Sequence, residues 1–343
     1  MENIIYRLFD KNKDIPNFLA LFELVYKFPI NVDYFKWKFE KNPGGLCYML
    51  VAEEREKGII GFASLTPYKF WISGQQRLAA QGVDTMVHPE FRKKGIFTTL
   101  TRKLLEYLHD NKLCFRYSAP GLLSYPGYIK LGSRKICRMP HMFRLNIINK
   151  IFKNKIALRD TSIKETSEIF KKGVLSLRLI TKADQRFDAL NIATASLAPI
   201  RVQKDSGFIN WRYLDNPIKP CKILGFFKNE ELLGYAAIRG GYLVDILYGQ
   251  DEEHIELFIK SAINYFDTKG TIMIETWFSG DSRIEKILRR KGFIVYWGKG
   301  LRKLLAMVDD YPLIAYVNES ECNPSMVSKP DNWYITMGDI DCM

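Results

Sequence analysis

The sequence lacks any run of apolar residues long enough to cross a membrane. A transmembrane helix needs about 18 or more consecutive apolar residues, and the chain of 343 residues contains no such run. Its first residues, MENIIYRLFDKNKD, are also too charged for a secretory signal peptide. We therefore expect no membrane span and a cytoplasmic location.

Residues that form disulfide frameworks or metal sites are few and scattered. The six cysteines form no CxxC pair, and the four histidines do not cluster with them. Disulfide scaffolds and structural zinc sites depend on such groupings. We expect neither a disulfide framework nor a metal site.

Negative charge is in short supply. The 51 Lys and Arg residues outnumber the 38 Asp and Glu residues, which gives a net charge of +13. Such a balance favours nucleic acid, an anionic membrane surface or a nucleotide cofactor as partner. The basic residues are spread along the whole chain, and no zinc finger or RNP-type aromatic motif is present. These observations argue against nucleic acid.

Residues 81–108 form the most informative stretch: an apolar strand, a basic turn with a glycine, and an amphipathic helix. The turn is Arg92-Lys93-Lys94-Gly95. One face of the helix carries the apolar residues Ile96, Phe97, Leu100, Leu104, Leu105 and Leu108. A helix start offers unpaired N–H groups and partial positive charge, and Gly95 lets a ligand approach closely. We predict a site for a phosphate or pyrophosphate.

The elements around this stretch predict a mixed sheet. From about residue 4 to residue 145 the order is strand, helices, three antiparallel strands, helix, strand, helix, strand. A mixed sheet with helices on its faces is the expected α/β or α+β layer fold.

Two motifs in this region resemble those of the GNAT superfamily of N-acetyltransferases. VHPEFRKKGIFTTL resembles the acyl-CoA signature, in which Arg or Gln, two variable residues, Gly, one variable residue and Gly or Ala wrap the pyrophosphate. YIKLG resembles the later tyrosine-x-lysine-leucine-glycine segment. Phe97 departs from the pattern, since a small residue is usual there. The resemblance implies acetyl-CoA as acyl donor and a primary amine of a small molecule as acceptor.

The resemblance also implies a role for each residue of the turn. The backbone of Met86 and Val87 would align the pantetheine arm and polarise the thioester carbonyl. The N–H groups from Lys93 to Phe97, with the charges of Arg92 and Lys94, would hold the pyrophosphate. The expected cofactor-binding residues are Met86, Val87, Arg92, Lys93, Lys94, Gly95, Ile96 and Phe97.

By the same resemblance, Tyr128 is the candidate general acid, because a phenol can protonate the leaving thiolate. Tyr125 is the reserve candidate. Asp84 is the candidate general base, although a carboxylate at this place could also pair with a lysine.

Other candidate bases remain open. They are Glu53, Glu54 and the two aspartates near the carboxyl end, Asp339 and Asp341. His88 has a suitable pKa for a base, but we assign it to the turn.

The chain repeats itself. YFKWKFEKNPGGLC at 34–47 aligns with FINWRYLDNPIKPC at 208–221, so that Trp37 matches Trp211. The interval that matches the basic turn has no Arg-x-x-Gly, and Leu288 stands where the first copy has Tyr128. We predict two tandem GNAT-like domains, of which the second is degenerate.

The expected division is a catalytic domain at 1–147, a degenerate domain at 148–318 and a tail at 319–343. Within the tail, Trp333, Tyr334 and Ile335 predict a last strand. The degenerate domain could serve only as structure, or it could help to form the acceptor site.

The acceptor is the least determined feature. Trp37, Tyr125, Asp339 and Asp341 are the candidate substrate-binding residues, because aromatic rings and carboxylates suit an aminated sugar. The ending WYITMGDID also resembles tandem GNAT proteins of surface-polysaccharide loci, which favours an amino sugar, free or nucleotide-linked, in surface glycan biosynthesis. Aminoglycosides, polyamines and peptide amines are alternatives, as is a non-catalytic module that binds acyl-CoA or a sugar.

Overall fold

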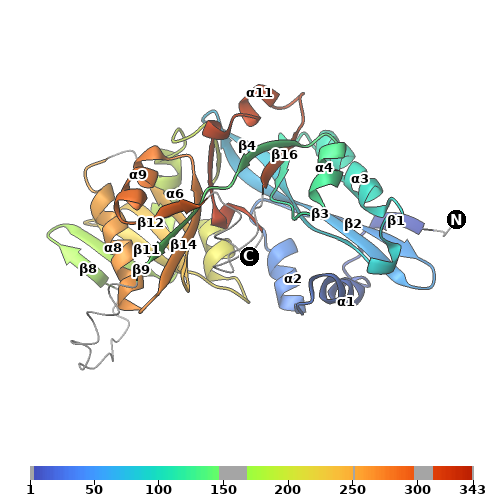
Figure 1. The fold of residues 1–343 in the computed structure, drawn as a ribbon, viewed down its shortest axis with the longest axis horizontal. Helices are drawn as coiled ribbons and strands as arrows, with labels where there is room; N and C mark the ends of the chain where they lie inside the picture. The colour runs from blue at the N-terminus through green and yellow to red at the C-terminus, as the bar shows by residue number, and fades with distance from the viewer. Residues whose placement is uncertain (1–3, 147–167, 250–251, 297–311, 342–343) are drawn as a thin grey trace. The chain divides into compact units, whose positions relative to one another are not determined.

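The computed structural model describes residues 4–146, 168–249, 252–296 and 312–341. They divide into two compact units of mixed α/β structure (Figure 1), which confirms the predicted fold class. Unit 1 comprises Met1–Arg138, Asp309–Pro330 and Ile340–Met343. Unit 2 comprises Met139–Val308 and Asp331–Asp339.

The sheet of unit 1 is antiparallel except for one neighbouring pair, β4 and β5, which are parallel. Its strands, in spatial order, are β1 (Ile4–Leu8), β2 (Tyr48–Glu54), β3 (Gly58–Ile72), β4 (Gln75–Val87), β5 (Phe115–Ser118), β16 (Pro312–Val317) and β6 (Arg134–Arg138). The central strand β3 is buried along nearly its whole length, as expected where helices cover both faces.

Helices cover the two faces of this sheet. On one face, α1 (Ile15–Tyr26) and α2 (Val32–Phe39) bury a phenylalanine-rich core against β2, β3 and β4. On the other face, α3 (Ile96–Asp110) buries its apolar stripe against the same strands. The remaining helices of unit 1 are η1 (Pro89–Phe91), α4 (Tyr125–Lys130) and α11 (Pro324–Val327).

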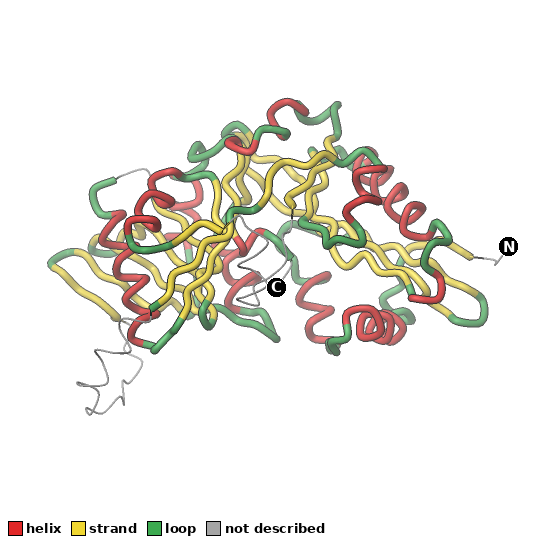
Figure 2. The backbone as a smooth tube through the Cα atoms, in the orientation of Figure 1, coloured by secondary structure: helices red, strands yellow, loops and turns green. Residues whose placement is uncertain are grey.

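Unit 2 repeats this arrangement, with β13 and β14 as its parallel pair. Its main strands, in spatial order, are β8 (Glu168–Lys172), β9 (Leu175–Ile180), β11 (Lys222–Lys228), β12 (Glu231–Arg239), β13 (Tyr242–Tyr248), β14 (Met273–Ser279), β7 (His141–Leu145) and β15 (Ile294–Tyr296). Its helices are α6 (Gln185–Ala193), α7 (Ser206–Ile209), η2 (Asn210–Leu214), α8 (Ile255–Thr268) and α9 (Ser282–Arg290). Figure 2 distinguishes strands and helices by colour.

Each sheet contains one strand from the other half of the sequence. In unit 1, β16 lies between β5 and β6. In unit 2, β7 occupies the matching place between β14 and β15. The units therefore differ from the linear division at 147 and 318. Apolar alternation predicts a strand but leaves its non-local partner open, so the exchange was not foreseen.

The carboxyl end returns to both units. The predicted last strand is confirmed as β17 (Trp333–Thr336), which pairs with β14 and with β10 (Ile200–Val202) in unit 2. Two short helices, η3 (Pro330–Asn332) and η4 (Met337–Asp339), flank it. Among the described residues, no helix is long and apolar enough to span a membrane.

Candidate active site

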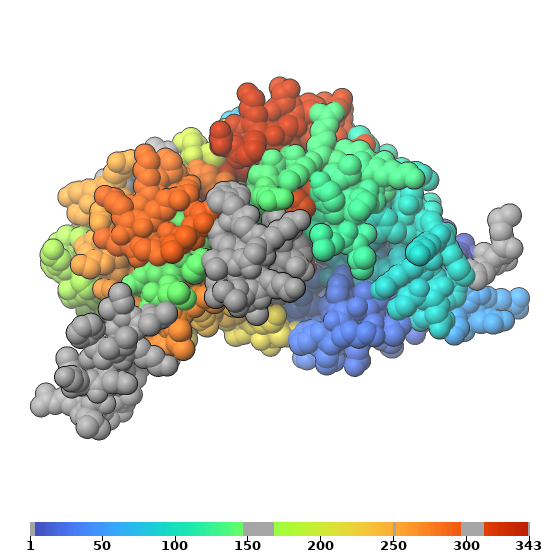
Figure 3. Space-filling view, viewed as in Figure 1, coloured from blue at the N-terminus to red at the C-terminus, as the bar shows by residue number. Residues whose placement is uncertain are grey.

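The basic turn connects β4 to α3 and leaves its backbone open to solvent. His88 begins the turn by accepting, at Nδ1, a hydrogen bond of 3.3 Å from the N–H of Glu90, which fits the turn role expected for it. Lys93 and Gly95 both adopt positive φ, 64° and 82°. A Cβ on Gly95 would meet nothing within 4 Å, and Arg92 to Gly95 are exposed. Figure 3 shows α3 and α4 on the visible face, in teal and green. The start of α3 thus has room for a phosphate group.

The strands β4 and β5 diverge beside this turn. They pair only at Ala80 with Arg116 and at Gln81 with Tyr117, while β4 continues along β3 to Val87. Among the described strands, residues 82–87 thus have no partner on the β5 side. The Met86 side chain is buried in the core under α1 and α2, so it leaves this edge open. An exposed strand edge can bind an extended amide-bearing arm such as pantetheine.

Tyr128 points its hydroxyl at β4. Its side chain is 4% exposed, and its hydroxyl donates a hydrogen bond of 2.8 Å to Oγ1 of Thr85. Its ring lies edge-on to the ring of Phe97 at 4.9 Å between centroids. The phenol therefore lies beside the open edge of β4, close to the start of α3.

Gly127 accommodates the unusual Phe97. A Cβ on Gly127 would lie 2.4 Å from Cε1 of Phe97, closer than real Cβ contacts come. The Phe97 ring therefore fills the space that a side chain at 127 would need. Because the ring packs on α4, it does not cover the open space at Gly95.

Asp84 is part of a buried ion cluster. The Nζ of Lys38 lies 2.6 Å from Oδ2 of Asp84 and 2.5 Å from Oδ2 of Asp341. These side chains are 5%, 9% and 8% exposed. Burial disfavours the Lys38 charge, but the carboxylates of Asp341 and Asp84 outweigh it and raise the pKa of Lys38 well above 10.5. Burial, with the nearby Asp341, raises the pKa of Asp84 despite Lys38.

This geometry does not fit two of the predicted roles. Asp84 is held by Lys38, so it is not a free base, and Asp341 is held by the same ammonium, so it is not open to an acceptor amine. Asp339 does not fit acceptor binding either. It is fully buried in unit 2, with Oδ1 3.0 Å from Nζ of Lys204.

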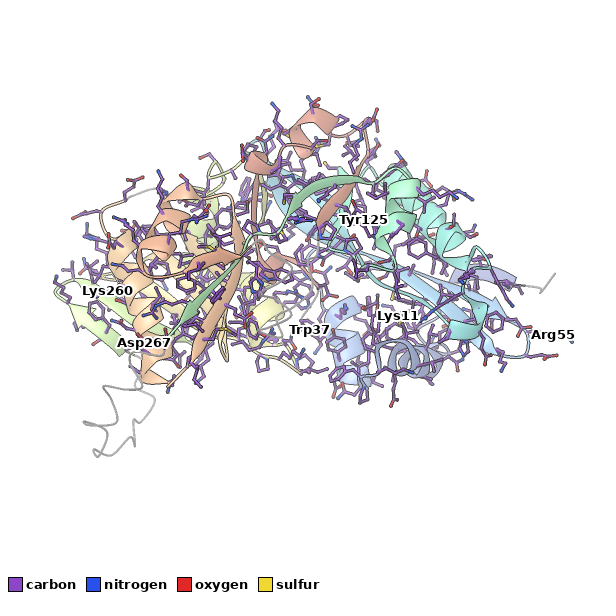
Figure 4. All side chains as sticks on the ribbon, viewed as in Figure 1. Lys11, Trp37, Arg55, Tyr125, Lys260 and Asp267 are labelled. Atoms are coloured by element: carbon purple, nitrogen blue, oxygen red, sulfur yellow. The ribbon has the colours of Figure 1, made fainter. Side chains whose placement is uncertain are left out.

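The other predicted residues also have internal contacts. Glu53 pairs with Arg7 at 2.6 Å, and Glu54 accepts hydrogen bonds from two N–H groups of the turn that follows it. Trp37 is buried on α2, whereas Tyr125 is half-buried at the start of α4. Figure 4 labels both. Of these residues, Tyr125 remains placed to meet a ligand.

The sequence analysis missed several residues of the site. They are Lys38, Gly82, Thr85, Arg116 and Gly127. Arg116 had a local signal, because it is the one charge in the apolar segment CFRYSA. Lys38 also had one, because aromatic residues flank it in YFKWKF. No local signal pairs Gly127 with Phe97, because they are neighbours only in the fold.

The corresponding place in unit 2 is built differently. On α9, Leu288 occupies the position of Tyr128, and its carbonyl accepts the same hydrogen bonds, from Lys291 and Phe293. Before α8 the described residues include the exposed, acidic Glu252 and Glu253. Acidic side chains at a helix start repel a pyrophosphate. Gln250 and Asp251, also expected in this turn, lie outside the described residues.

A metal centre finds no support in the part of the chain described above, where no group of three or more His, Cys, Asp or Glu side chains could hold an ion.

Comparison with known proteins agrees with this geometry. Residues 7–135 match the family model described as an acetyltransferase (GNAT) domain. No curated protein sequence matches the chain.

Solved structures extend the likeness to most of the chain. A GCN5-related N-acetyltransferase from Anabaena variabilis ATCC 29413 has a TM-score of 0.63 at 13% identity, covering 92% of this chain and 73% of the other. A probable N-acyltransferase from Enterococcus faecalis V583 has a TM-score of 0.61 at 15% identity, with the same coverage. A GCN5-related glucosamine N-acetyltransferase region in a fungal multi-domain GH3 beta-N-acetylglucosaminidase has a TM-score of 0.55 at 11% identity, covering 92% and 38%.

At these identities, the structural likeness shows the fold. The protein has the GNAT fold, and residues 7–135 are similar to a GNAT acetyltransferase domain. These findings support an N-acetyltransferase, and acetyl-CoA is the donor that the GNAT fold family uses.

Proposed function

We propose that unit 1 transfers an acetyl group directly from acetyl-CoA to a primary amine of an amino sugar or a nucleotide-linked amino sugar. The observation that carries this proposal is the place of Tyr128. Its hydroxyl lies against the open edge of β4, beside an exposed turn where a Cβ on Gly95 would meet open space. These adjoining elements would bring the donor site and the proton donor together.

The turn and the strand edge would hold the donor. The N–H groups at the start of α3 and the charges of Arg92 and Lys94 suit a pyrophosphate. The edge of β4 at Met86 and Val87 suits the pantetheine amides. When bound, acetyl-CoA supplies an activated thioester.

Tyr128 would act as general acid. It would give its hydroxyl proton to the leaving sulfur. Thr85 now accepts that proton in a hydrogen bond, and a threonine hydroxyl can also donate. We infer that Thr85 keeps the phenol directed at β4 before and after the proton moves.

The amine proton would go to water. The predicted bases Asp84, Glu53 and Glu54 all have partners inside unit 1. A protonated amine has no lone pair for attack, so the rate should follow the ionisation of the acceptor amine itself. A pH–rate profile that is the same for acceptors of different amine pKa would contradict this and point to a base in the protein.

The amino-sugar acceptor rests on two supports. One structural relative is named as a glucosamine N-acetyltransferase region. The tail also resembles those of tandem proteins from surface-polysaccharide loci, which motivates the proposed role in surface glycan biosynthesis. Within the sequence-predicted acceptor set, Tyr125 is the residue that we keep for sugar contact.

We further propose that unit 2 has lost donor binding. Leu288 cannot donate a proton, and Glu252 and Glu253 oppose an anion at the start of α8.

Thiol release from acetyl-CoA by the full-length protein tests the proposal. The acceptor panel should include free and nucleotide-linked amino sugars, aminoglycosides, polyamines and peptide amines. Release that depends on an amino sugar, and that Tyr128→Phe loses, is the expected result. Release that depends on an amine other than an amino sugar would contradict the proposed acceptor and identify that amine's class as the acceptor. Donor binding without release from any acceptor would instead favour a binding module, and no donor binding would refute the site.

A further inference from the structure

Arg116 is a buried cation whose guanidinium nitrogens have no hydrogen-bond partner among the described residues. It lies on β5 where β4 and β5 begin to diverge, and its side chain is 1% exposed. Its Nε, Nη1 and Nη2 make no hydrogen bond to any residue that the structure describes. An ionised group buried without a partner destabilises the folded protein. The fold therefore tolerates a costly group at this place.

Two contacts fix the guanidinium. Its Cζ lies 4.0 Å from the ring centroid of Tyr128. The guanidinium also packs against the backbone at Gly82, where an added Cβ would come within 2.2 Å of Nη2, so a larger residue there would displace the guanidinium. Burial lowers the pKa of Arg116, and Tyr128 opposes this change. Arginine still carries its charge at neutral pH.

The fold itself does not require an unpaired charge at this position. In unit 2 the residue at the matching register on β14 is Ile274, because the corresponding pairs are Gln81 with Tyr117 and Tyr242 with Glu275, and Arg116 and Ile274 each come one residue earlier. Ile274 is apolar and fully buried. The unit without a proton-donating tyrosine thus has an apolar residue here, and the unit with Tyr128 has a buried cation.

We propose that Arg116 is a positioning residue, which holds the Tyr128 ring and stabilises the negative charge left on its phenol oxygen when the proton moves to the leaving sulfur. This proposal rests on the proposed function. The amine nitrogen forms the new bond to the acyl carbon, the carbon–sulfur bond breaks, and its electrons remain on sulfur. Sulfur takes the Tyr128 proton, the amine nitrogen loses its proton to water, and the phenolate regains a proton from water.

The first test replaces the charge by an apolar chain of similar length, Arg116→Met. We expect kcat to fall by about 30-fold, the rate equivalent of losing a desolvated cation–π contact, with an unchanged Kd for acetyl-CoA by calorimetry. Because an unpaired buried charge is removed, Tm should stay the same or rise. An unchanged kcat would overturn the proposal. So would a fall in Tm that accompanies the loss of kcat, because it would indicate a structural role.

Arg201→Met is the matched control. Arg201 in unit 2 is also buried, but Nη2 donates to the carbonyl oxygen of Asn191 at 2.8 Å and Nη1 donates to that of Val202 at 3.2 Å. This variant should lower Tm, because it removes buried hydrogen bonds that the charged guanidinium donates, and should keep kcat per folded molecule. If both variants behaved alike, Arg116 would have no special role.

The second test uses Arg116→Ala, and it also serves if the methionine variant misfolds. Free guanidinium ion should restore part of kcat, and neutral urea at the same concentration should not. Rescue by neither compound would overturn the proposal. If the wild-type protein bound acetyl-CoA without turnover, the proposed function would fail first, and this inference with it. Wild-type turnover with an unaffected Arg116→Met variant would overturn this inference alone.

Discussion

The two units share a strand order and differ where chemistry would occur. In both units two neighbouring parallel strands diverge, β4 and β5 in unit 1 and β13 and β14 in unit 2. In both, a strand from the other half of the sequence completes the sheet. A helix follows the first strand of each parallel pair, α3 after β4 and α8 after β13. Unit 1 has Tyr128 and Arg116, and unit 2 has Leu288 and Ile274 at the matching positions. The fold persists without these groups, so their presence in unit 1 reflects function.

Both units also keep a buried lysine between two aspartates. Lys38 contacts Asp84 and Asp341 in unit 1. In unit 2, Lys204 contacts Asp245 at 2.6 Å and Asp339 at 3.0 Å. Asp84 and Asp245 occupy matching places on β4 and β13. Each lies three residues before the residue that pairs with a repeated glycine of the neighbouring strand, which is Gly61 in unit 1 and Gly234 in unit 2. The repeat aligns Lys38 with Arg212, so the two lysines stand at different positions of the fold. Because each cluster is buried inside its own unit, we assign both to stability.

The largest expected effect is on catalysis. Tyr128→Phe should lower kcat by about 10²- to 10⁴-fold, the usual share of a general acid, with an unchanged Kd for acetyl-CoA, because the phenol ring remains. Steady-state kinetics and calorimetry measure both quantities. Tyr125→Phe, on the same helix, is the control and should keep most of kcat. If the Tyr125 variant lost activity and the Tyr128 variant kept it, the roles would be reversed.

The next effect tests the shared clusters. Lys38→Met and Lys204→Met should each cost about 3–5 kcal/mol of unfolding free energy, because each leaves two buried carboxylates uncompensated. Urea unfolding measures the loss, with separate probes for the two units in case they unfold separately. A small loss in either variant would break the parallel between the units.

The Lys38 cluster also predicts a pH dependence. A lysine whose pKa is raised by folding stabilises the protein fully below its unfolded value of about 10.4. That stability is lost as the pH rises through the higher, folded value. Wild-type stability should therefore fall in alkaline solution above about pH 10 more steeply than that of Lys38→Met. If the stability of both proteins fell equally steeply with pH, the ion cluster would not stabilise the charge of Lys38.

A medium effect concerns packing around α4, the helix that carries Tyr128. Gly127→Ala should cost about 1–3 kcal/mol, as overpacking does, because the new methyl group meets the Phe97 ring. It should also lower kcat by moving Tyr128. The double variant Phe97→Leu, Gly127→Ala should recover part of both losses in a double-mutant cycle. Additive losses would show that Phe97 is not the obstacle.

The smallest expected effect distinguishes backbone strain at Gly95 from a role of Gly95 in binding acetyl-CoA. Gly95→Ala should cost about 1 kcal/mol of stability, because φ is positive there, and it should also weaken acetyl-CoA binding. Gly74→Ala and Gly240→Ala are matched controls, with positive φ and open space for a Cβ in the corresponding hairpins of the two units. They should cost as much stability and leave donor affinity unchanged. Weaker binding in all three would indicate a general effect of strain.

Much of unit 1 follows from the sequence because its signals are local. Apolar periodicity predicts β4 and α3, and the Arg-x-x-Gly turn between them predicts open backbone N–H groups. The repeat at 34–47 and 208–221 predicts a second copy of the fold. The missing turn and Leu288 also predict which copy lacks the chemistry. Each of these needs only residues that are neighbours in the chain.

The tertiary structure decided what depends on distant partners. Strands β7 and β16 exchange units because hydrogen-bond partners are set across the sheet and not along the chain. Asp84 was open to two roles from sequence, and Lys38 reaches it only after α2 packs on the sheet. Arg116 and Tyr128 meet in the same way. Sequence supplies the reactive groups, but burial and long-range contacts determine which are held and which remain unpaired.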